Sequence, residues 1–194
     1  MIQTLLNNIN VFVTLSPEEE TIVGSFFRSK MFRKRQYILQ EGQKARYKTF
    51  IVKGITRTYE VDETGQEHIF QFGLENWWVG DLYSFLTDTD SNYNIDCLED
   101  TEVLQITRPD LEIAFERVPK MERYFRINVE NTFVATTKRV SSTLAKSAME
   151  RYDEFLKRFP QIEQRVPNHQ IASYLGITPQ SLSRIRSQAA TRSR

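Results

Sequence analysis

The sequence is poor in the residues that build cross-linked or metal-bound scaffolds. It contains one cysteine, Cys97, and two histidines among 194 residues. A single cysteine excludes a disulfide within the chain and an iron–sulfur cluster or zinc site held by four thiolates, and we expect a cytoplasmic protein. Only one histidine falls in the strand-rich region, so the histidine cluster of a metal-dependent jelly-roll enzyme is missing. We expect no metal, and no set of catalytic residues indicates an enzyme.

Long apolar runs are also missing. No stretch of 18 apolar residues occurs, so we expect no membrane span. The first ten residues lack the basic start and the apolar centre of a secretory signal. With 40% hydrophobic residues, the chain can still form the core of one sizeable domain or of two small ones.

Charge is unevenly distributed, although the net charge is only +1. Residues 145–194 carry nine Lys and Arg against four Asp and Glu, and the other 144 residues carry 17 against 21. A basic C-terminal segment on an acidic body is typical of a nucleic-acid-binding module attached to another domain. A solvated basic tail would give the same counts, so charge alone leaves both interpretations open.

The first half of the chain changes from helical to strand-like periodicity. Residues 1–30 are predicted to be helical, with Ser16 and Glu19 as a capping box around Pro17. From Tyr37 the period becomes two, and glycine-containing turns separate short segments rich in β-branched and aromatic residues. The predicted strands cover residues 37–39, 49–52, 55–61, 68–72 and 101–106. This spacing favours a β-sandwich or barrel.

A long helical pattern follows a short helix predicted over 110–116. Its apolar stripe is Val118, Met121, Phe125, Val129, Phe133, Thr136, Val140 and Leu144, at spacings of three or four. A narrow stripe on a long helix is typical of a dimer seam. Packing of the helix on its own barrel is the alternative, and we favour the dimer. A further helix is predicted over 146–159.

The strongest local pattern is a helix-turn-helix between Pro167 and Arg186. Ala172 is small where two helices cross, and Gly176, four residues later, suits a left-handed helix end. Thr178 and Pro179 fit the cap and first position of the next helix. The apolar residues Ile171, Leu175, Leu182 and Ile185 form the expected shared core, with Ile177 in the turn. An ordinary helical hairpin is the alternative.

Polar residues on the second helix are candidates for DNA contact. Arg184 is suited to a bidentate contact with guanine, whereas Arg186, Arg192 and Arg194 suit phosphates. His169 is a candidate cap or phosphate contact at the start of the motif. The predicted DNA-binding set is His169, Thr178, Pro179, Gln180, Ser181, Arg184, Arg186 and Ser187. Residues 188–194 are too few for a β-hairpin wing, and we expect residues 189–194 to form a frayed basic tail.

The chain resembles the cyclic-nucleotide-receptor-protein/Fnr (Crp/Fnr) regulators. Residues 50–59 followed by Gly65-Gln66-Glu67 resemble the family's sensor hairpins, and Gly80-Asp81-Leu82 is similar to the Gly-Glu-Leu of its phosphate-binding cassette. The long helix and the helix-turn-helix come in the family's order. The resemblance implies an α+β protein: a double-stranded β-helix (jelly-roll) sensor at 1–117, a dimerisation helix at 118–145 and a DNA-binding domain at 146–194.

The resemblance also implies that Pro179, Gln180 and Arg184 read bases. Arg184 keeps the family's arginine, whereas Pro179 and Gln180 depart from the best-known members, so their target sequence does not carry over. The implied partners are double-stranded DNA and a second copy of the chain. RNA polymerase and an unidentified small-molecule effector are further candidate partners.

The cassette departs from the family at the phosphate site. The arginine that binds the cyclic phosphate falls at about Ser91, and residues 58–107 contain twelve Asp and Glu but no Lys or Arg. A buried phosphate needs a paired cation or many amide donors. We therefore expect no cAMP or cGMP binding of the family's usual kind. The N-terminal cysteines of the Fnr branch are missing, so no iron–sulfur cluster is expected.

An apolar effector pocket is one interpretation of the aromatic residues around the cassette, and barrel core is the other. The candidate pocket set is Phe70, Phe72, Trp78, Gly80, Asp81, Leu82, Tyr83, Ser91 and Asn92, with Trp77, Phe85 and Tyr93 nearby. The segment 88–99 partly resembles a calcium loop, but Tyr93 occupies the position that needs glycine, so we favour an acidic surface loop. Cys97 lacks basic neighbours, which favours a buried structural thiol over a redox sensor.

The sequence therefore predicts a dimeric DNA-binding transcription regulator that binds a two-fold symmetric site and is not controlled by cAMP. The alternative is a ligand-binding or protein-interaction module whose helix-turn-helix does not read DNA. A constitutive regulator, in which the barrel serves only for dimerisation, also stays open. If the protein does switch, a population shift of the long helix would carry the signal.

Overall fold

The computed structural model describes residues 1–160 and 162–192, which form two compact units. The first unit comprises Met1–Val61 and Phe70–Glu130, and the second comprises Asp62–Ile69 and the chain from Asn131 onward. The 26-residue helix α5 (Lys120–Ala145) contributes to both units. Among the helices of the described residues, none has the length and hydropathy needed to cross a lipid bilayer.

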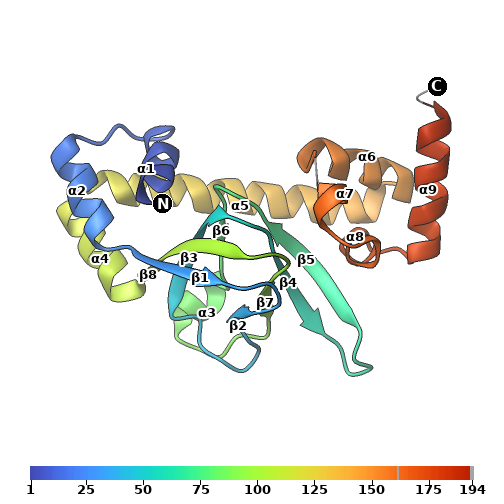
Figure 1. Cartoon of the computed structure of the whole chain (residues 1–194), viewed down its shortest axis with the longest axis horizontal. Helices are drawn as coiled ribbons and strands as arrows, with labels where there is room; N and C mark the ends of the chain where they lie inside the picture. The colour runs from blue at the N-terminus through green and yellow to red at the C-terminus, as the bar shows by residue number, and fades with distance from the viewer. Residues whose placement is uncertain (161, 193–194) are drawn as a thin grey trace. The chain divides into compact units, whose positions relative to one another are not determined.

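Two four-stranded sheets form the body of the first unit (Figure 1), except that the first three residues of strand β5 belong to the second unit. Their strand orders are β1-β8-β3-β6 and β2-β7-β4-β5, and the chain passes repeatedly between the two sheets, as in a jelly roll. The strands are β1 (Arg28–Phe32), β2 (Tyr37–Leu39), β3 (Tyr47–Lys53), β4 (Thr56–Val61), β5 (Glu67–Gly73), β6 (Trp78–Val79), β7 (Asn94–Cys97) and β8 (Thr101–Thr107). The predicted fold class is confirmed.

The strand β1 corrects the prediction that residues 1–30 are helical. It is the edge strand of its sheet and pairs only with β8, from Arg28 opposite Gln105 to Phe32 opposite Thr101. Four of its five side chains are exposed, so the sequence shows neither apolar alternation nor a buried run. The short strand β6 and the helix α3 (Leu82–Thr87) were likewise absent from the predicted elements.

Three helices and the first turns of α5 supply the other apolar surface of the first unit. They are α1 (Ile2–Asn10), α2 (Pro17–Ser25) and α4 (Arg108–Arg117). The predicted capping box at α2 is confirmed, because the Ser16 side chain accepts from the Glu19 amide and the Glu19 carboxylate accepts from the Ser16 amide. Buried residues from these helices and from β3 and β8 form one core: Leu5, Ile9, Phe50, Leu104, Ile106, Leu111 and Met121.

A glycine closes the turn between β3 and β4. Gly54 has φ +109, a conformation that side chains disfavour. A Cβ at this position would lie 2.8 Å from the Thr101 Cα, so the neighbouring backbone also requires glycine here.

The apolar stripe of α5 divides into two parts with different environments. Val118, which precedes α5 and caps α4, is buried in the first unit's core together with Met121 and Phe125. Val129, Phe133, Val140 and Leu144 are exposed in the single chain, Leu144 by 84%. The start of the stripe therefore packs in the chain's own first unit, as the alternative interpretation expected. For the exposed part, the dimer seam stays a prediction.

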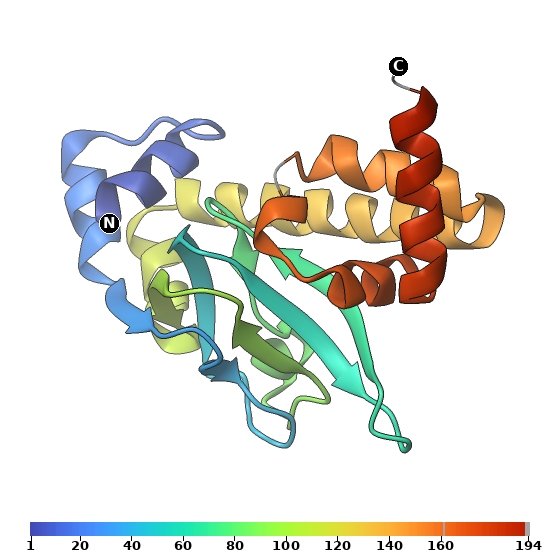
Figure 2. The same cartoon turned by 45° about the vertical axis from the view of Figure 1, so that its right-hand side comes forward.

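The second unit is helical from Asn131 onward. Figure 2 shows α6 (Ala148–Arg158), α7 (Ile162–Arg165), α8 (Asn168–Leu175) and α9 (Pro179–Arg192) beside the C-terminal half of α5. Their core consists of Tyr152, Phe155, Phe159, Ile162, Val166, Ile171, Ala172, Leu175, Leu182 and Ile185. This confirms the four core residues predicted for the helix-turn-helix. The predicted frayed tail is wrong up to Arg192, because α9 continues to that residue; Ser193 and Arg194 lie outside the described residues.

Cys97 lies in the core of the barrel. Its side chain packs with Phe32 and Val103 and is 1% exposed. Burial raises the pKa of the Cys97 thiol to about 11, and the hydrogen bond with Thr101 only partly offsets that rise. The thiolate is the reactive form, so this site disfavours redox chemistry.

We predict that Cys97 is unreactive in the folded protein. At pH 7.5, a chromogenic disulfide reagent should modify it at least about a hundredfold more slowly than in denaturant, because both access and the thiolate form are restricted. The measurement is the absorbance time course with and without urea. Complete labelling of the folded protein at the rate of the unfolded chain would contradict the assigned environment.

We also predict a large difference between two aromatic truncations. Phe50→Ala removes a ring that is 0% exposed and should destabilise the first unit by about 3–5 kcal/mol. Tyr83→Ala removes a ring that is 70% exposed and should change stability by less than about 0.5 kcal/mol. Urea unfolding followed by tryptophan fluorescence compares the two variants, and equal midpoints would contradict the core described above.

Candidate DNA-binding surface and effector pocket

The turn between α8 and α9 has the geometry that the helix-turn-helix pattern predicted. Gly176 adopts φ 65° and ψ 38°, in the left-handed region that favours glycine. The Ile177 amide donates to the Ala172 carbonyl at 3.0 Å. Thr178 then caps α9, since its hydroxyl accepts from the Ser181 amide at 3.2 Å. The two helices are therefore joined by a short turn whose hydrogen bonds hold α9 in place.

One face of α9 is polar and open to solvent. Pro179, Gln180, Arg184 and Ser187 are exposed, whereas Leu182 and Ile185 are buried. Ser183 is also exposed and lies on the same face, a position that the sequence reasoning missed although its spacing from Gln180 indicates it. Of the predicted base-reading residues, the structure thus brings Gln180 and Arg184 together on one surface.

Other members of the predicted DNA-binding set have partners inside the protein. The Arg186 guanidinium bonds to the Asn168 and Glu163 side chains and is only partly exposed. The Ser187 hydroxyl donates to the Ser183 carbonyl, and the hydroxyls of Thr178 and Ser181 bond to each other. These contacts give Arg186 a role in holding α9 against α7 and the start of α8, and a phosphate contact by its partly exposed guanidinium stays a prediction.

His169 is exposed in the first turn of α8. The N-cap of that helix is Pro167, which supplies no side-chain cap, so the proposed capping role of His169 is wrong. A phosphate contact by this side chain stays a prediction.

In the sensor, polar groups of the cassette form hydrogen bonds with one another. Asp81 caps α3 by accepting from the Ser84 amide at 3.2 Å, and its other oxygen accepts from the Ser91 hydroxyl at 2.8 Å. Asp81 and Ser91 are both buried. A carboxylate therefore occupies the N-terminus of α3, and the residue at the family's arginine position is a hydrogen-bond donor to that carboxylate.

Basic side chains from outside residues 58–107 lie near the cassette. Lys44 forms an ion pair with Asp88 at 2.8 Å, and Arg46 lines a cavity together with Gly80. Burial lowers the pKa of Lys48 to about 8, and the Asp81 carboxylate opposes that shift. The count of residues 58–107 therefore gave an incomplete view of the charge at the cassette, because the loop before β3 and β3 itself bring basic side chains to it.

The predicted aromatic effector pocket does not form as one lining. Phe72 is fully buried, Tyr83 is 70% exposed and Asn92 is exposed, while Leu82 packs partly buried on the first unit's core. Trp78 packs on Phe125 at 4.9 Å between ring centroids and donates to the Tyr124 hydroxyl at 2.8 Å.

Phe70 instead pairs with Tyr93, with their ring centroids 4.5 Å apart. Burial raises the pKa of Tyr93, with Asp81 and Glu60 adding to the rise. Both rings are partly exposed, and they pack on each other outside the buried core of the barrel.

A cavity of about 550 Å³ does lie beside the cassette. Gly80 is the member of the predicted pocket set that lines it, and the buried pair Gln105 and Thr49, joined by a 3.0 Å hydrogen bond, lies in its wall. The rest of the lining comes mainly from residues 38–47. Within residues 1–160 and 162–192, no group of three or more His, Cys, Asp or Glu side chains is arranged to hold a metal.

Comparison with known proteins agrees with this architecture. Residues 29–118 match the family model of the cyclic nucleotide-binding domain. No curated protein sequence matches the chain. FixK2 from Bradyrhizobium japonicum has a similar structure, with 23% identity, 86% of each chain covered and a TM-score of 0.76.

Two further solved structures are similar over most of their length. The catabolite activator protein of Thermus thermophilus is 19% identical, with 94% of this chain and 87% of that chain covered and a TM-score of 0.60. CLP of Xanthomonas campestris, a c-di-GMP-responsive global regulator, is 12% identical, with 92% and 93% covered and a TM-score of 0.73. The chain therefore has the fold of Crp/Fnr regulators, with a domain that matches the cyclic nucleotide-binding model followed by a helix-turn-helix.

Proposed function

We propose that the protein is a transcription regulator that binds a two-fold symmetric DNA site as a dimer. The observation that carries this proposal is the exposed face of α9, where Gln180, Ser183 and Arg184 lie on a helix fixed by a capped turn. Side chains of this kind can hydrogen-bond to base edges in a major groove. The similar fold of FixK2 and of the catabolite activator protein supports the same reading.

In this proposal, Arg184 is the residue that recognises the DNA sequence. It is exposed, and its guanidinium offers the bidentate donors that match guanine O6 and N7. Arg186, two residues later, is tied to Glu163 and Asn168 and therefore supports α9 from behind. The two arginines thus have separable roles, one in recognition and one in stability.

Dimerisation is proposed through the exposed apolar face of α5. Val129, Phe133, Val140 and Leu144 recur at helical spacing and are between 42% and 84% exposed. Such a continuous stripe is unfavourable in water unless a partner covers it. A second α5 supplies a matching stripe, and the two-fold axis of that pair would impose two-fold symmetry on the DNA site.

We further propose that cAMP and cGMP do not control the protein in the family's usual way. The Asp81 carboxylate occupies the N-terminus of α3, and the residue at the position of the family's arginine is Ser91, which donates to Asp81. A cyclic phosphate placed there would meet a buried carboxylate in place of a guanidinium. RNA polymerase and an effector of another kind remain proposed partners, and the proposal assigns no catalytic residues.

We predict that selection from a random duplex pool, at about 0.15 M salt, enriches a palindromic motif equally with and without cAMP. Arg184→Ala should then lower affinity for that motif by about 1–3 kcal/mol, roughly fivefold to 150-fold, because a bidentate base contact is lost. Arg123→Ala, which removes an exposed arginine from the first unit, is the charge-matched control and should bind within about twofold.

Each outcome of the selection is informative. Enrichment only with cAMP would keep the DNA-binding proposal and contradict the cyclic-nucleotide proposal. No motif in either arm would favour an interaction module whose helix-turn-helix does not read DNA. Equal losses for the Arg184 and Arg123 variants would show that α9 contributes charge and no base recognition.

A further inference from the structure

One side chain of helix α8 bonds to the backbone of strand β5. The Ser173 hydroxyl accepts a hydrogen bond from the Ile69 amide at 3.0 Å and donates one to the Glu67 carbonyl at 2.9 Å. Ile69 and Glu67 lie 104 and 106 residues before Ser173 in the sequence. The hydroxyl therefore uses both its donor and its acceptor on one short stretch of a distant backbone.

The strand that Ser173 contacts is the edge of its sheet, because the strand order is β2-β7-β4-β5. The outer side of an edge strand carries amides and carbonyls that have no strand partner. Glu67 and Ile69 are two residues apart, so their backbone groups point to the same side of β5. Ser173 therefore takes the place of a neighbouring strand at this point, and the Ile69 side chain is buried there, with 3% exposed.

The hairpin that presents this edge, residues 62–69, is held in shape by Asp62. One oxygen of the Asp62 carboxylate accepts from the amides of Thr64 and Gln66 at 2.9 and 3.0 Å, and the other bonds to the His68 ring at 2.6 Å. The hydrogen bond with His68, together with those from Thr64 and Gln66, lowers the pKa of Asp62. Because its own contacts order the turn, the hairpin offers α8 a defined backbone edge.

Ser173 lies in the interior of α8, where serine is a weaker helix former than alanine. A serine inside a helix commonly turns its hydroxyl to solvent or to a carbonyl of the preceding turn. Among the contacts of the described residues, the Ser173 hydroxyl bonds to the hairpin backbone and to no carbonyl of α8. The hairpin contact therefore gives this serine a role that alanine could not fill.

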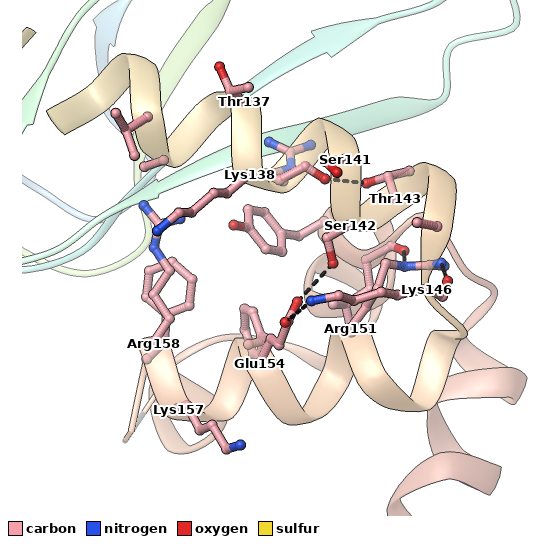
Figure 3. Close-up of a pocket in the computed structure, with 18 of the residues that line it drawn as sticks. Thr137, Lys138, Ser141, Ser142, Thr143, Lys146, Arg151, Glu154, Lys157 and Arg158 are labelled. Atoms are coloured by element: carbon pink, nitrogen blue, oxygen red, sulfur yellow. Dashed lines mark hydrogen bonds and ion pairs between the residues drawn. The ribbon is translucent and has the colours of Figure 1, made fainter. Parts of the chain in front are cut away.

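Separate contacts hold α8 on α6. The Leu175 carbonyl accepts from the Arg151 guanidinium at 3.3 Å, and the Tyr174 ring packs on Phe155 at 5.4 Å between centroids. Figure 3 shows Arg151 on α6, near the end of α5. Loss of the Ser173 hydroxyl would leave these contacts intact, so the fold of the helix-turn-helix does not depend on the hairpin contact.

The hairpin is continuous with two strands of the sensor barrel. Residues 62–69 belong to the second unit, whereas β4 up to Val61 and β5 from Phe70 onward belong to the first. The Phe70 ring packs on Tyr93, with centroids 4.5 Å apart. Through Ser173, the helix-turn-helix is therefore attached to a strand that continues into the barrel.

We propose that Ser173 is a positioning residue for DNA recognition, which holds the helix-turn-helix on the hairpin so that both copies of α9 are oriented before DNA binds. This inference rests on the proposed function. The side chains of Gln180 and Arg184 are exposed while the Ser173 contact is closed, so the closed contact is compatible with base recognition. A dimer with oriented recognition helices loses less conformational freedom on a palindrome.

Hydrogen exchange of the full chain without DNA, followed by NMR, tests the contact itself. Ser173→Ala should raise the exchange rate of the Ile69 amide by about fivefold or more, because the amide loses its acceptor. The amides of α8 should exchange as slowly as in the wild type, since alanine favours the helix. Ser173→Thr keeps a hydroxyl and should leave the Ile69 rate within about threefold of the wild type.

Binding to two duplexes tests the positioning role. On the selected palindrome, Ser173→Ala should bind about fivefold or more weakly than the wild type, because the second α9 has a lower effective concentration at its half-site. On a duplex with a single half-site, the two proteins should differ by less than about twofold, because one α9 needs no orientation relative to another. Damage to the helix-turn-helix would instead lower both affinities alike.

Ser25 provides a matched control. It is an exposed serine at the end of α2, and its hydroxyl donates to the Ile22 carbonyl of the same helix. Ser25→Ala removes the same hydroxyl group without changing the hairpin contact. This variant should match the wild type within about twofold on both duplexes and in the exchange rate of the Ile69 amide.

Three results for Ser173→Ala would overturn the inference alone, provided that the wild type binds the palindrome. These are an unaltered exchange rate at Ile69, equal losses on the palindrome and the half-site, or tighter binding to the palindrome. A wild type that binds neither duplex would contradict the proposed function, and the positioning role would fail with it. The exchange data would in that case still show whether the hairpin contact forms.

Discussion

The structure depends on burying one side of a single long helix, α5. Its first turns place Met121 and Phe125 in the core of the first unit, next to β3 and α4. Its last turns form a wall of the second unit, against α6. Between and beyond these contacts, an apolar stripe stays exposed in the single chain. The helix thus packs in the core of the first unit, forms a wall of the second and also presents an apolar stripe that stays exposed to solvent in the single chain.

Because α5 contributes to both units, it connects the sensor barrel to the helix-turn-helix. A partner helix on the stripe would fix the two copies of α9 relative to a two-fold axis. The barrel contributes a cassette whose polar groups, Asp81 and Ser91, already satisfy each other.

Much of the architecture was predictable because it follows local rules. Caps and turns at Ser16, Gly176 and Thr178 are determined by nearby backbone groups, and they were read correctly. The edge strand β1 was missed because its side chains are mostly exposed and carry no apolar alternation. Long-range contacts were also invisible: the tie of Arg186 to Glu163, and the approach of Lys44 and Lys48 to the cassette, join segments far apart in sequence. Spacing along a chain cannot report which distant charge will compensate another.

The central claim is that the exposed stripe of α5 makes the protein a dimer that reads a symmetric site. The most direct measurement is the mass of the protein–DNA complex by sedimentation equilibrium on a duplex carrying the selected palindrome, with Val140→Asp beside the wild type. The account predicts two chains per duplex for the wild type. It predicts a monomer with at least about a hundredfold weaker binding for the variant, because a charge in an apolar seam is costly. A wild-type complex with one chain per duplex, or an unaltered dimer in the variant, would contradict it.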